Sequence, residues 1–113
     1  MNTVDQQESQ AREVRRGSVV LACLLALRSP GYGYGLLERL QERGIDVDAN
    51  TLYPLLRRLE EQGLLASEWD TEGARPRKYY RTSKEGEQRA DALLEAWMKL
   101  TDSINHLKEE FPK

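Results

Sequence analysis

Hydrophobic residues follow helical spacing in the first half of the chain and strand-like spacing after residue 63. Residues 19–27 are almost entirely apolar, which predicts a helix that is buried on most sides and ends at the Ser-Pro-Gly sequence of residues 29–31. Apolar residues at helical spacing predict a second helix over residues 34–43 and a third that ends at Gln62, each followed by a glycine. Three short helices joined by tight turns are therefore expected.

The pattern after Gly63 predicts a β-hairpin. Residues 64–69 and 78–82 have the spacing and the residue types of strands, and a loop with Gly73 and Pro76 separates them. A hairpin that follows three helices is typical of the wing of a winged helix-turn-helix.

The last part of the chain predicts one long helix. Helical spacing continues from residue 83 to about residue 110. The helix opens either with a capping box from Thr82 to Glu85 or with a simple cap from Ser83. The expected fold is therefore mainly α with a small β-hairpin, as a winged helix-turn-helix plus a long C-terminal dimerisation helix.

Composition divides the chain into three parts. Residues 1–11 are rich in Gln and Glu with almost nothing apolar, so a flexible N-terminal tail is expected there. Residues 12–82 form the expected winged helix-turn-helix DNA-binding domain, and residues 83–113 the C-terminal dimerisation helix.

Length and composition exclude several classes of protein. The 113 residues suffice for one domain, and the longest apolar run is about half of what a membrane span needs. The N-terminus lacks the features of a signal peptide, and the lone Cys23 cannot form an internal disulfide, so we expect a cytoplasmic protein. With one histidine and no metal-binding or nucleophile motif, we expect no enzyme, no cofactor and no metal site. The short apolar run predicts no membrane association.

The net charge of −2 argues against a nucleic-acid partner, but the charge is uneven along the chain. Residues 73–84 hold five cations and no acid. Without acidic neighbours, the cations of the loop are expected to be unpaired, and a wing would carry them to flanking phosphates or into the minor groove. The candidates on the wing are Arg75, Arg77 and Lys78.

The third helix has one apolar and one polar face. Steps of about 100° per residue put four leucines on the inward face and Asn50, Tyr53 and Arg57 on the other. Asn pairs with adenine, Arg with guanine or a phosphate and Tyr with a phosphate, so double-stranded DNA is the expected partner of this helix. Pro54 favours a helix start at Asn50 or Thr51, and Thr51 joins the DNA-binding candidates.

The glycine-tyrosine sequence of residues 31–35 superficially suggests a phosphate loop. It lacks the Lys-Ser/Thr pair and the preceding buried strand, so we interpret it as a flexible turn that leads into the second helix. Tyr32, near the N-terminus of that helix, is a further candidate for a phosphate contact, and a packing role is equally consistent.

The last helix has an apolar stripe too wide for a small core to cover. Dimerisation against a second copy explains it and would place two recognition helices on a palindromic site. The alternative is that the helix folds back on its own domain. Trp97 is expected to anchor the interface or to line a pocket for a flat ligand. The interface candidates are Leu93, Leu94, Trp97, Leu100, Thr101, Ile104 and Leu107.

Four stretches of the sequence carry a family resemblance: Tyr32-Gly33-Tyr34, Thr51-Leu52-Tyr53-Pro54-Leu55-Leu56-Arg57-Arg58-Leu59-Glu60, Gly63-Leu64, and Arg75-Pro76-Arg77-Lys78-Tyr79-Tyr80-Arg81 before Glu85-Gly86. They closely resemble the PadR family of bacterial transcriptional regulators. The resemblance implies a winged-helix dimer that usually represses transcription and releases DNA when a small planar or aromatic effector binds or the cell state changes.

The single helix after the wing resembles the short branch of that family, in which this helix and the first one build the dimer. Some short members hold flat ligands between interface tryptophans, which makes Trp97 the ligand-binding candidate. Asn50 stands where the family often has glycine, so the operator sequence does not follow from the resemblance. The alternative function is a winged-helix protein-interaction module without DNA binding, which the net charge of −2 permits.

Overall fold

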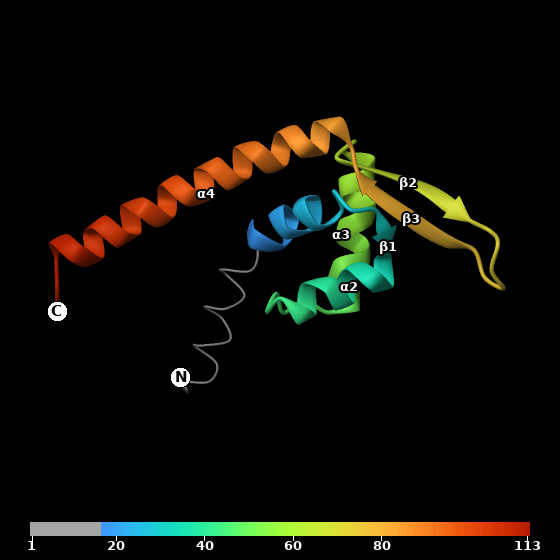
Figure 1. Cartoon of the computed structure of the whole chain (residues 1–113), viewed down its shortest axis with the longest axis horizontal. Helices are drawn as coiled ribbons and strands as arrows, with labels where there is room; N and C mark the ends of the chain where they lie inside the picture. Colours follow the sequence, from blue (N-terminus) through green and yellow to red (C-terminus); the bar gives the residue numbers. More distant parts are fainter. Residues whose placement is uncertain (1–16) are drawn as a thin grey trace.

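The computed structural model describes residues 17–113 (Figure 1), and the tail expected at residues 1–11 lies outside them. Residues 17–26 form the first described helix. The elements that follow are β1 (Gly31–Tyr32), α2 (Gly33–Glu42), α3 (Ala49–Glu61), β2 (Leu65–Asp70), β3 (Arg77–Thr82) and α4 (Lys84–Glu110). The mainly α fold with a small hairpin is thereby confirmed.

The sheet contains one strand more than the sequence pattern predicts. Its order is β1-β3-β2, with both pairings antiparallel. In β1, Gly31 lies opposite Tyr80 and Tyr32 opposite Tyr79. The interpretation of residues 31–35 as a flexible turn is therefore wrong, because two of them are paired in the sheet and the next three begin α2.

Helix α3 begins before the position that Pro54 favours. Asp48 caps the helix, with its carboxylate accepting a hydrogen bond from the backbone N–H of Thr51 at 2.8 Å. Such a cap stabilises a helix by about 1 kcal/mol. Pro54 consequently lies inside the helix and cannot donate to the carbonyl of Asn50. Both residues are exposed, so the lost hydrogen bond falls on the side of the helix that faces solvent.

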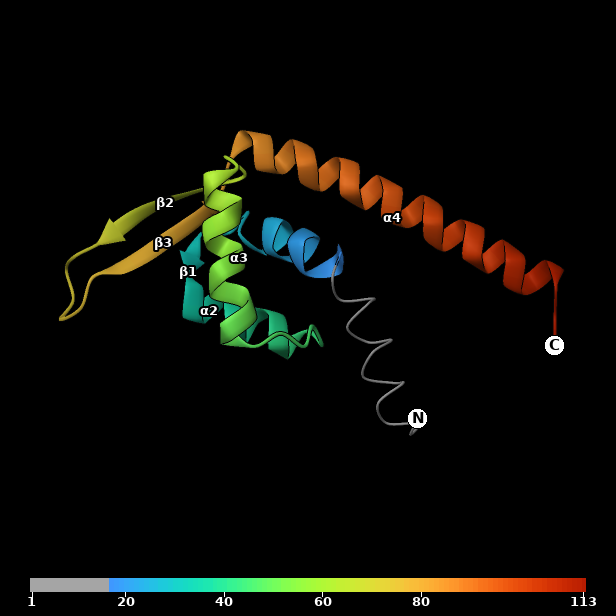
Figure 2. The same cartoon turned by 180° about the vertical axis from the view of Figure 1, so that it is seen from behind.

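Glycines end α2 and α3 as the sequence predicts. Gly44 and Gly63 have φ angles of 81° and 77°, which residues with a Cβ rarely adopt. The chain therefore turns sharply after each helix. Figure 2 shows the result, with α3 crossing in front of α2, β1 and the β2–β3 wing on one side of α3, and α4 leaving on the other.

The start of α4 is joined closely to the core. Ser83 caps the helix by accepting from the N–H of Gly86 at 3.0 Å, which confirms the simple cap, and the Thr82 hydroxyl donates to the Leu24 carbonyl at 2.6 Å. A Cβ on Gly86 would stand 2.0 Å from the Leu64 carbonyl oxygen, so only glycine fits. The core around this junction consists mainly of leucines: Leu24, Leu27, Leu36, Leu40, Leu52, Leu56, Leu59, Leu64 and Leu65.

Among residues 17–113, no helix combines the length and the apolar character needed to cross a membrane.

Candidate nucleic-acid interface

The exposed face of α3 is the one that helical spacing predicts. The four inward leucines are buried, and Asn50, Thr51, Tyr53 and Arg57 are exposed. No hydrogen bond or ion pair within the described part of the chain engages the side chains of Asn50, Tyr53 or Arg57. The donors and acceptors of this face are therefore available to a partner.

Contact with α2 fixes the position of Tyr53. A Cβ on Gly33, the first residue of α2, would lie 2.8 Å from Cε1 of the Tyr53 ring. The two helices of the helix-turn-helix thus approach closely at this point, and part of the tyrosine still faces solvent. Any larger residue at position 33 would push the ring away from α2.

Two of the three wing cations have acidic partners, which contradicts the expectation that they are unpaired. Lys78 Nζ lies 2.9 Å from Oε1 of Glu60 on α3, and Arg77 lies 3.8 Å from Asp70 across the hairpin. Both acids lie outside residues 73–84 in the sequence. Strand pairing brings Asp70 to Arg77, and the packing of α3 against the wing brings Glu60 to Lys78. Arg75, at the exposed tip, has no ion-pair partner among residues 17–113.

Glu60 ties α3 to the base of the wing. Its carboxylate accepts hydrogen bonds from the Ser67 hydroxyl on β2 and from Lys78 on β3. These bonds, with that from Ser67 the larger contribution, lower the pKa of Glu60, and the Glu60 bond raises the pKa of Lys78. Both groups are charged at neutral pH, so the connection is an ion pair reinforced by a hydroxyl.

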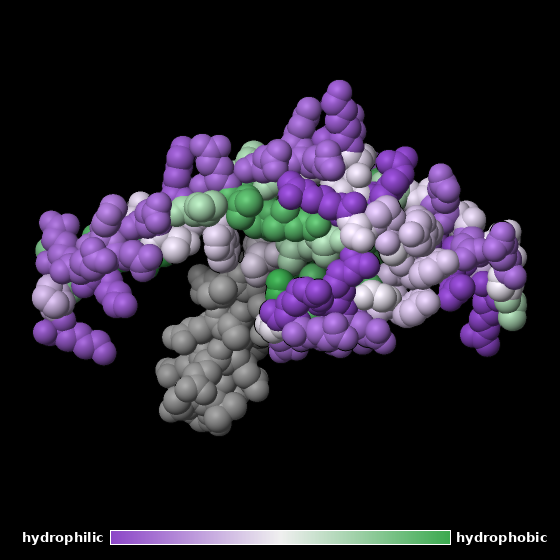
Figure 3. Space-filling view, in the orientation of Figure 1, coloured by the Kyte–Doolittle hydropathy of each residue, from purple (hydrophilic) through white to green (hydrophobic). Residues whose placement is uncertain are grey.

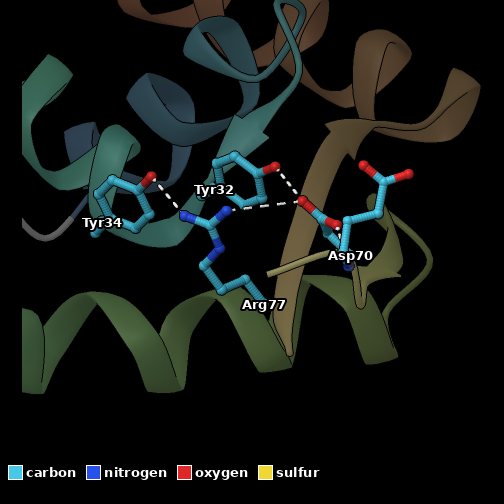
Figure 4. Close-up of polar contacts among 5 residues, drawn as sticks. Tyr32, Tyr34, Asp70 and Arg77 are labelled. Atoms are coloured by element: carbon cyan, nitrogen blue, oxygen red, sulfur yellow. Dashed lines mark hydrogen bonds and ion pairs between the residues drawn. The ribbon is translucent and has the colours of Figure 1, made fainter. Parts of the chain in front are cut away.

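A second cluster ties the wing to the start of α2 (Figure 4). The Tyr32 hydroxyl donates to Asp70 at 2.5 Å, and Arg77 lies 4.4 Å above the Tyr32 ring and donates to the Tyr34 hydroxyl at 3.1 Å. Donation from Tyr32 is the main reason that the pKa of Asp70 is lowered, and it raises the pKa of Tyr32. The packing role of Tyr32 is therefore the one that its contacts support.

The sequence reasoning missed Glu60, Ser67, Asp70 and Tyr34. Asp70 could have been found, since pairing the predicted strands places it opposite Arg77. Glu60 gave no such signal, because its partners lie on strands whose position against α3 is a matter of tertiary packing.

The apolar stripe of α4 is covered only near its beginning. Leu93 and Leu94 pack partly against the core, whereas Trp97 is 42% exposed and Leu100, Ile104 and Leu107 are each more than half exposed. Thr101, also exposed, donates its hydroxyl to the carbonyl of Trp97. The alternative that the whole helix folds back on its own domain is therefore wrong beyond Leu94. Figure 3 shows hydrophobic side chains gathered along α4 and on the body beside it.

The described residues offer little for catalysis or metal binding. Burial raises the pKa of the Cys23 thiol to about 12, so the sulfur is protonated and unreactive at neutral pH. Residues 17–113 contain no group of three or more His, Cys, Asp or Glu side chains placed to hold a metal ion.

Residues 20–92 match the family model described as the transcriptional regulator PadR-like family. Transcriptional regulator Rv3488 of Mycobacterium tuberculosis is 40% identical over 76 residues, which cover 66% of this chain and 71% of the relative.

Structure comparison gives the same family. A PadR family transcriptional regulator from Eggerthella lenta has a TM-score of 0.87 and 50% identity, over 93% of this chain and 94% of that one. A PadR-like transcription factor from Bacteroides fragilis has a TM-score of 0.72 and 34% identity, over 94% of this chain and 99% of that one. The similarity includes the long helix after the wing as well as the winged helix itself.

Proposed function

The chain belongs to the PadR-like family of transcriptional regulators, which are not enzymes, and we propose that it is a dimeric repressor that binds a palindromic operator. The observation that carries the proposal is the exposed stripe of Asn50, Tyr53 and Arg57 on α3, beside a wing whose tip presents Arg75 without an acidic partner in the described part of the chain.

In the proposed complex, the N-terminal half of α3 enters the major groove. Asn50 pairs with adenine and Arg57 with guanine or a phosphate, while Thr51 and Tyr53 offer hydroxyls to the backbone. The buried leucines on the opposite face hold the helix against the core, so the reading side chains are presented on a fixed support.

The wing adds contacts beside the groove. Arg75 reaches a flanking phosphate or the minor groove from the tip. Arg77 and Lys78 are paired with Asp70 and Glu60, so their main contribution is to hold the wing in place beside α3.

The exposed half of α4 supplies the dimer contact. Its side chains offer an apolar column from Trp97 to Leu107 that a second copy of the helix would cover. The partly buried apolar residues of the first described helix, among them Val20 and Leu25, extend the interface in the proposed dimer. A two-fold dimer would place its two α3 helices on half-sites about 34 Å apart, one turn of the duplex.

A small planar or aromatic effector is proposed to bind between the two Trp97 rings of the dimer. The support is the 42% exposure of Trp97 in the middle of the apolar column. A groove of about 540 Å³, lined by Leu25, Arg39, Leu40 and neighbouring residues, lies apart from Trp97. Quenching by planar dyes that is equal in wild type and Trp97→Phe would remove Trp97 from the effector site.

Electrophoretic mobility shift with duplexes that tile the DNA upstream of the chain's own gene tests the main proposal. Retarded complexes at low and moderate salt are expected, with the tightest binding to a palindromic segment. The absence of a shift even at low salt would favour the winged-helix protein-interaction module.

A further inference from the structure

We infer that Trp69 is a DNA-backbone contact, through which the wing holds the sugar-phosphate chain beside the groove that α3 enters. The inference deepens the proposed function and rests on it. Trp69 is 62% exposed, although an indole is among the most favourable side chains to bury. It belongs neither to the core nor to the apolar column of α4, so neither the fold nor the proposed dimer accounts for it.

The strand register places Trp69 on the α3 side of the wing. It lies opposite Lys78, and the next pairs on the same face are Ser67 with Tyr80 and Leu65 with Thr82. That face packs against the body, because Tyr80 and Leu65 are buried and Glu60 of α3 bonds to Ser67 and Lys78. Trp69 therefore continues this face outward, past the edge of the core and toward the tip.

The acids that neighbour Trp69 in the sequence point away from it. Alternation along β2 puts Glu68 and Asp70 on the opposite face, where Asp70 is held by Tyr32 and Arg77. On the Trp69 face, Glu60 of α3 has its charge matched by Lys78. A phosphate can therefore approach the indole without meeting an unpaired carboxylate on that face.

A short chain of contacts fixes the indole relative to α3. Lys78 Nζ lies 2.9 Å from Glu60 Oε1 and 5.5 Å from the centre of the Trp69 ring, within the range of a cation–π contact. The ammonium is thus shared between the recognition helix and the wing tryptophan.

The single exposed ring suits DNA better than a protein partner. Protein interfaces of standard size bury about 800 Å² on each side around clustered apolar residues, and Tyr79, the other exposed aromatic residue of the wing, lies on the opposite face. An indole can pack its flat face on the apolar edge of a deoxyribose while its Nε1–H donates to a phosphate oxygen. The contact would be independent of sequence and would carry no ionic charge.

The two tryptophans of the chain allow a direct test. In Trp97→Phe, Trp69 is the sole indole, and its emission is followed while an upstream duplex of about 30 base pairs is added at low salt. We expect its emission to change with the same midpoint as the mobility shift of that variant. A normal mobility shift with unchanged emission would overturn the inference and leave the proposed function standing. No mobility shift of the wild-type chain would overturn both. If only Trp97→Phe fails to shift, the affinity of Trp69→Ala, which retains Trp97, decides the inference.

Removal of the Trp69 ring measures how much the contact contributes to DNA affinity. Trp69→Ala is expected to weaken binding to all duplexes about five- to tenfold, with an unchanged dependence on salt, and Trp69→Phe to recover most of the loss. The ring is mostly exposed, so the thermal unfolding of Trp69→Ala should match that of the wild type. Affinity equal to wild type in Trp69→Ala would contradict a backbone contact.

Discussion

The surface formed by α3 and the wing differs from the outer half of α4 in how many of its side chains have partners within the described part of the chain. On the first, Lys78, Arg77 and Tyr32 are each engaged by a neighbour, and the other exposed groups are polar except for aromatic rings such as that of Trp69. On the second, the apolar residues beyond Leu94 have no cover among residues 17–113. An internally braced polar surface is ready to bind a polyanion, whereas an uncovered apolar helix needs a second apolar surface before it is stable in water.

The largest effect is expected from charge placed on the exposed half of α4. Leu100→Glu combined with Ile104→Glu should convert the proposed dimer to a monomer, because each protomer would have to bury two carboxylates in an apolar interface. Loss of the second half-site should then weaken operator binding by more than about 100-fold. Light scattering after size exclusion measures the mass, and mobility shift measures the affinity.

Met98→Glu is the matched control for that variant. Met98 and Leu100 are both 58% exposed, but they stand on opposite sides of the helix. A dimer that survives Met98→Glu and not the double variant would assign the interface to one face of α4. A double variant that remains dimeric would contradict the proposed interface.

Changes on α3 should alter which sequences are preferred. Asn50→Ala or Arg57→Ala is expected to cost about 1–3 kcal/mol at the cognate operator and much less on unrelated DNA, since each removes a contact to a base edge. Arg43→Ala, which removes an exposed arginine at the far end of α2, serves as the control. Equal losses on all duplexes would mean that these residues bind the backbone alone.

The wing tip should respond differently from the wing base. Arg75→Ala is expected to weaken binding to every duplex several-fold and to reduce the slope of log K against log salt by about 1, because one phosphate contact is lost. Arg77→Ala should lower affinity with a smaller change in slope, since Arg77 already lies against Asp70 and Tyr32. Similar slopes in the two variants would show that the internal pairing of Arg77 does not persist on DNA.

The smallest effect is expected from the tie between α3 and the wing, and it should depend on pH. The pKa of Glu60 is lowered in the folded chain, so its stabilisation is present above the ordinary carboxyl value of about 4.3 and is lost as the pH falls through the lowered pKa. Glu60→Gln should therefore reduce the free energy of unfolding by ~1 kcal/mol at pH 7. The difference from wild type should shrink toward pH 3. Denaturant unfolding at both pH values measures this, and a constant difference would argue against an ionic contribution.

The sequence predicted the parts of the site that depend on local periodicity. Helical spacing was enough to separate the buried leucines of α3 from Asn50, Tyr53 and Arg57, and the glycines at 44 and 63 marked where helices end. The start of α3 was mispredicted because the cost of Pro54 was weighed without the cap that Asp48 supplies.

Contacts between distant segments escaped prediction. β1 is only two residues long, too short for a pattern, and it exists because β3 offers it an edge. The pairing of Lys78 with Glu60 joins residues 18 positions apart, and it depends on how the hairpin lies against α3. An acid-free run of sequence therefore did not mean unpaired cations. Burial of the first half of α4 and exposure of the second depend likewise on where the core ends.

The junction at the start of α4 has a mechanical consequence. Gly86 lies close against the Leu64 carbonyl and Thr82 is bonded to Leu24, so these contacts hold the start of the 27-residue helix to the domain that carries α3. The helix acts as a lever arm about 40 Å long, whose far end moves about 3.5 Å for each 5° of tilt. In a dimer built on α4, a molecule that binds between the two α4 helices and separates them would change the positions of both α3 helices at once, without contacting either.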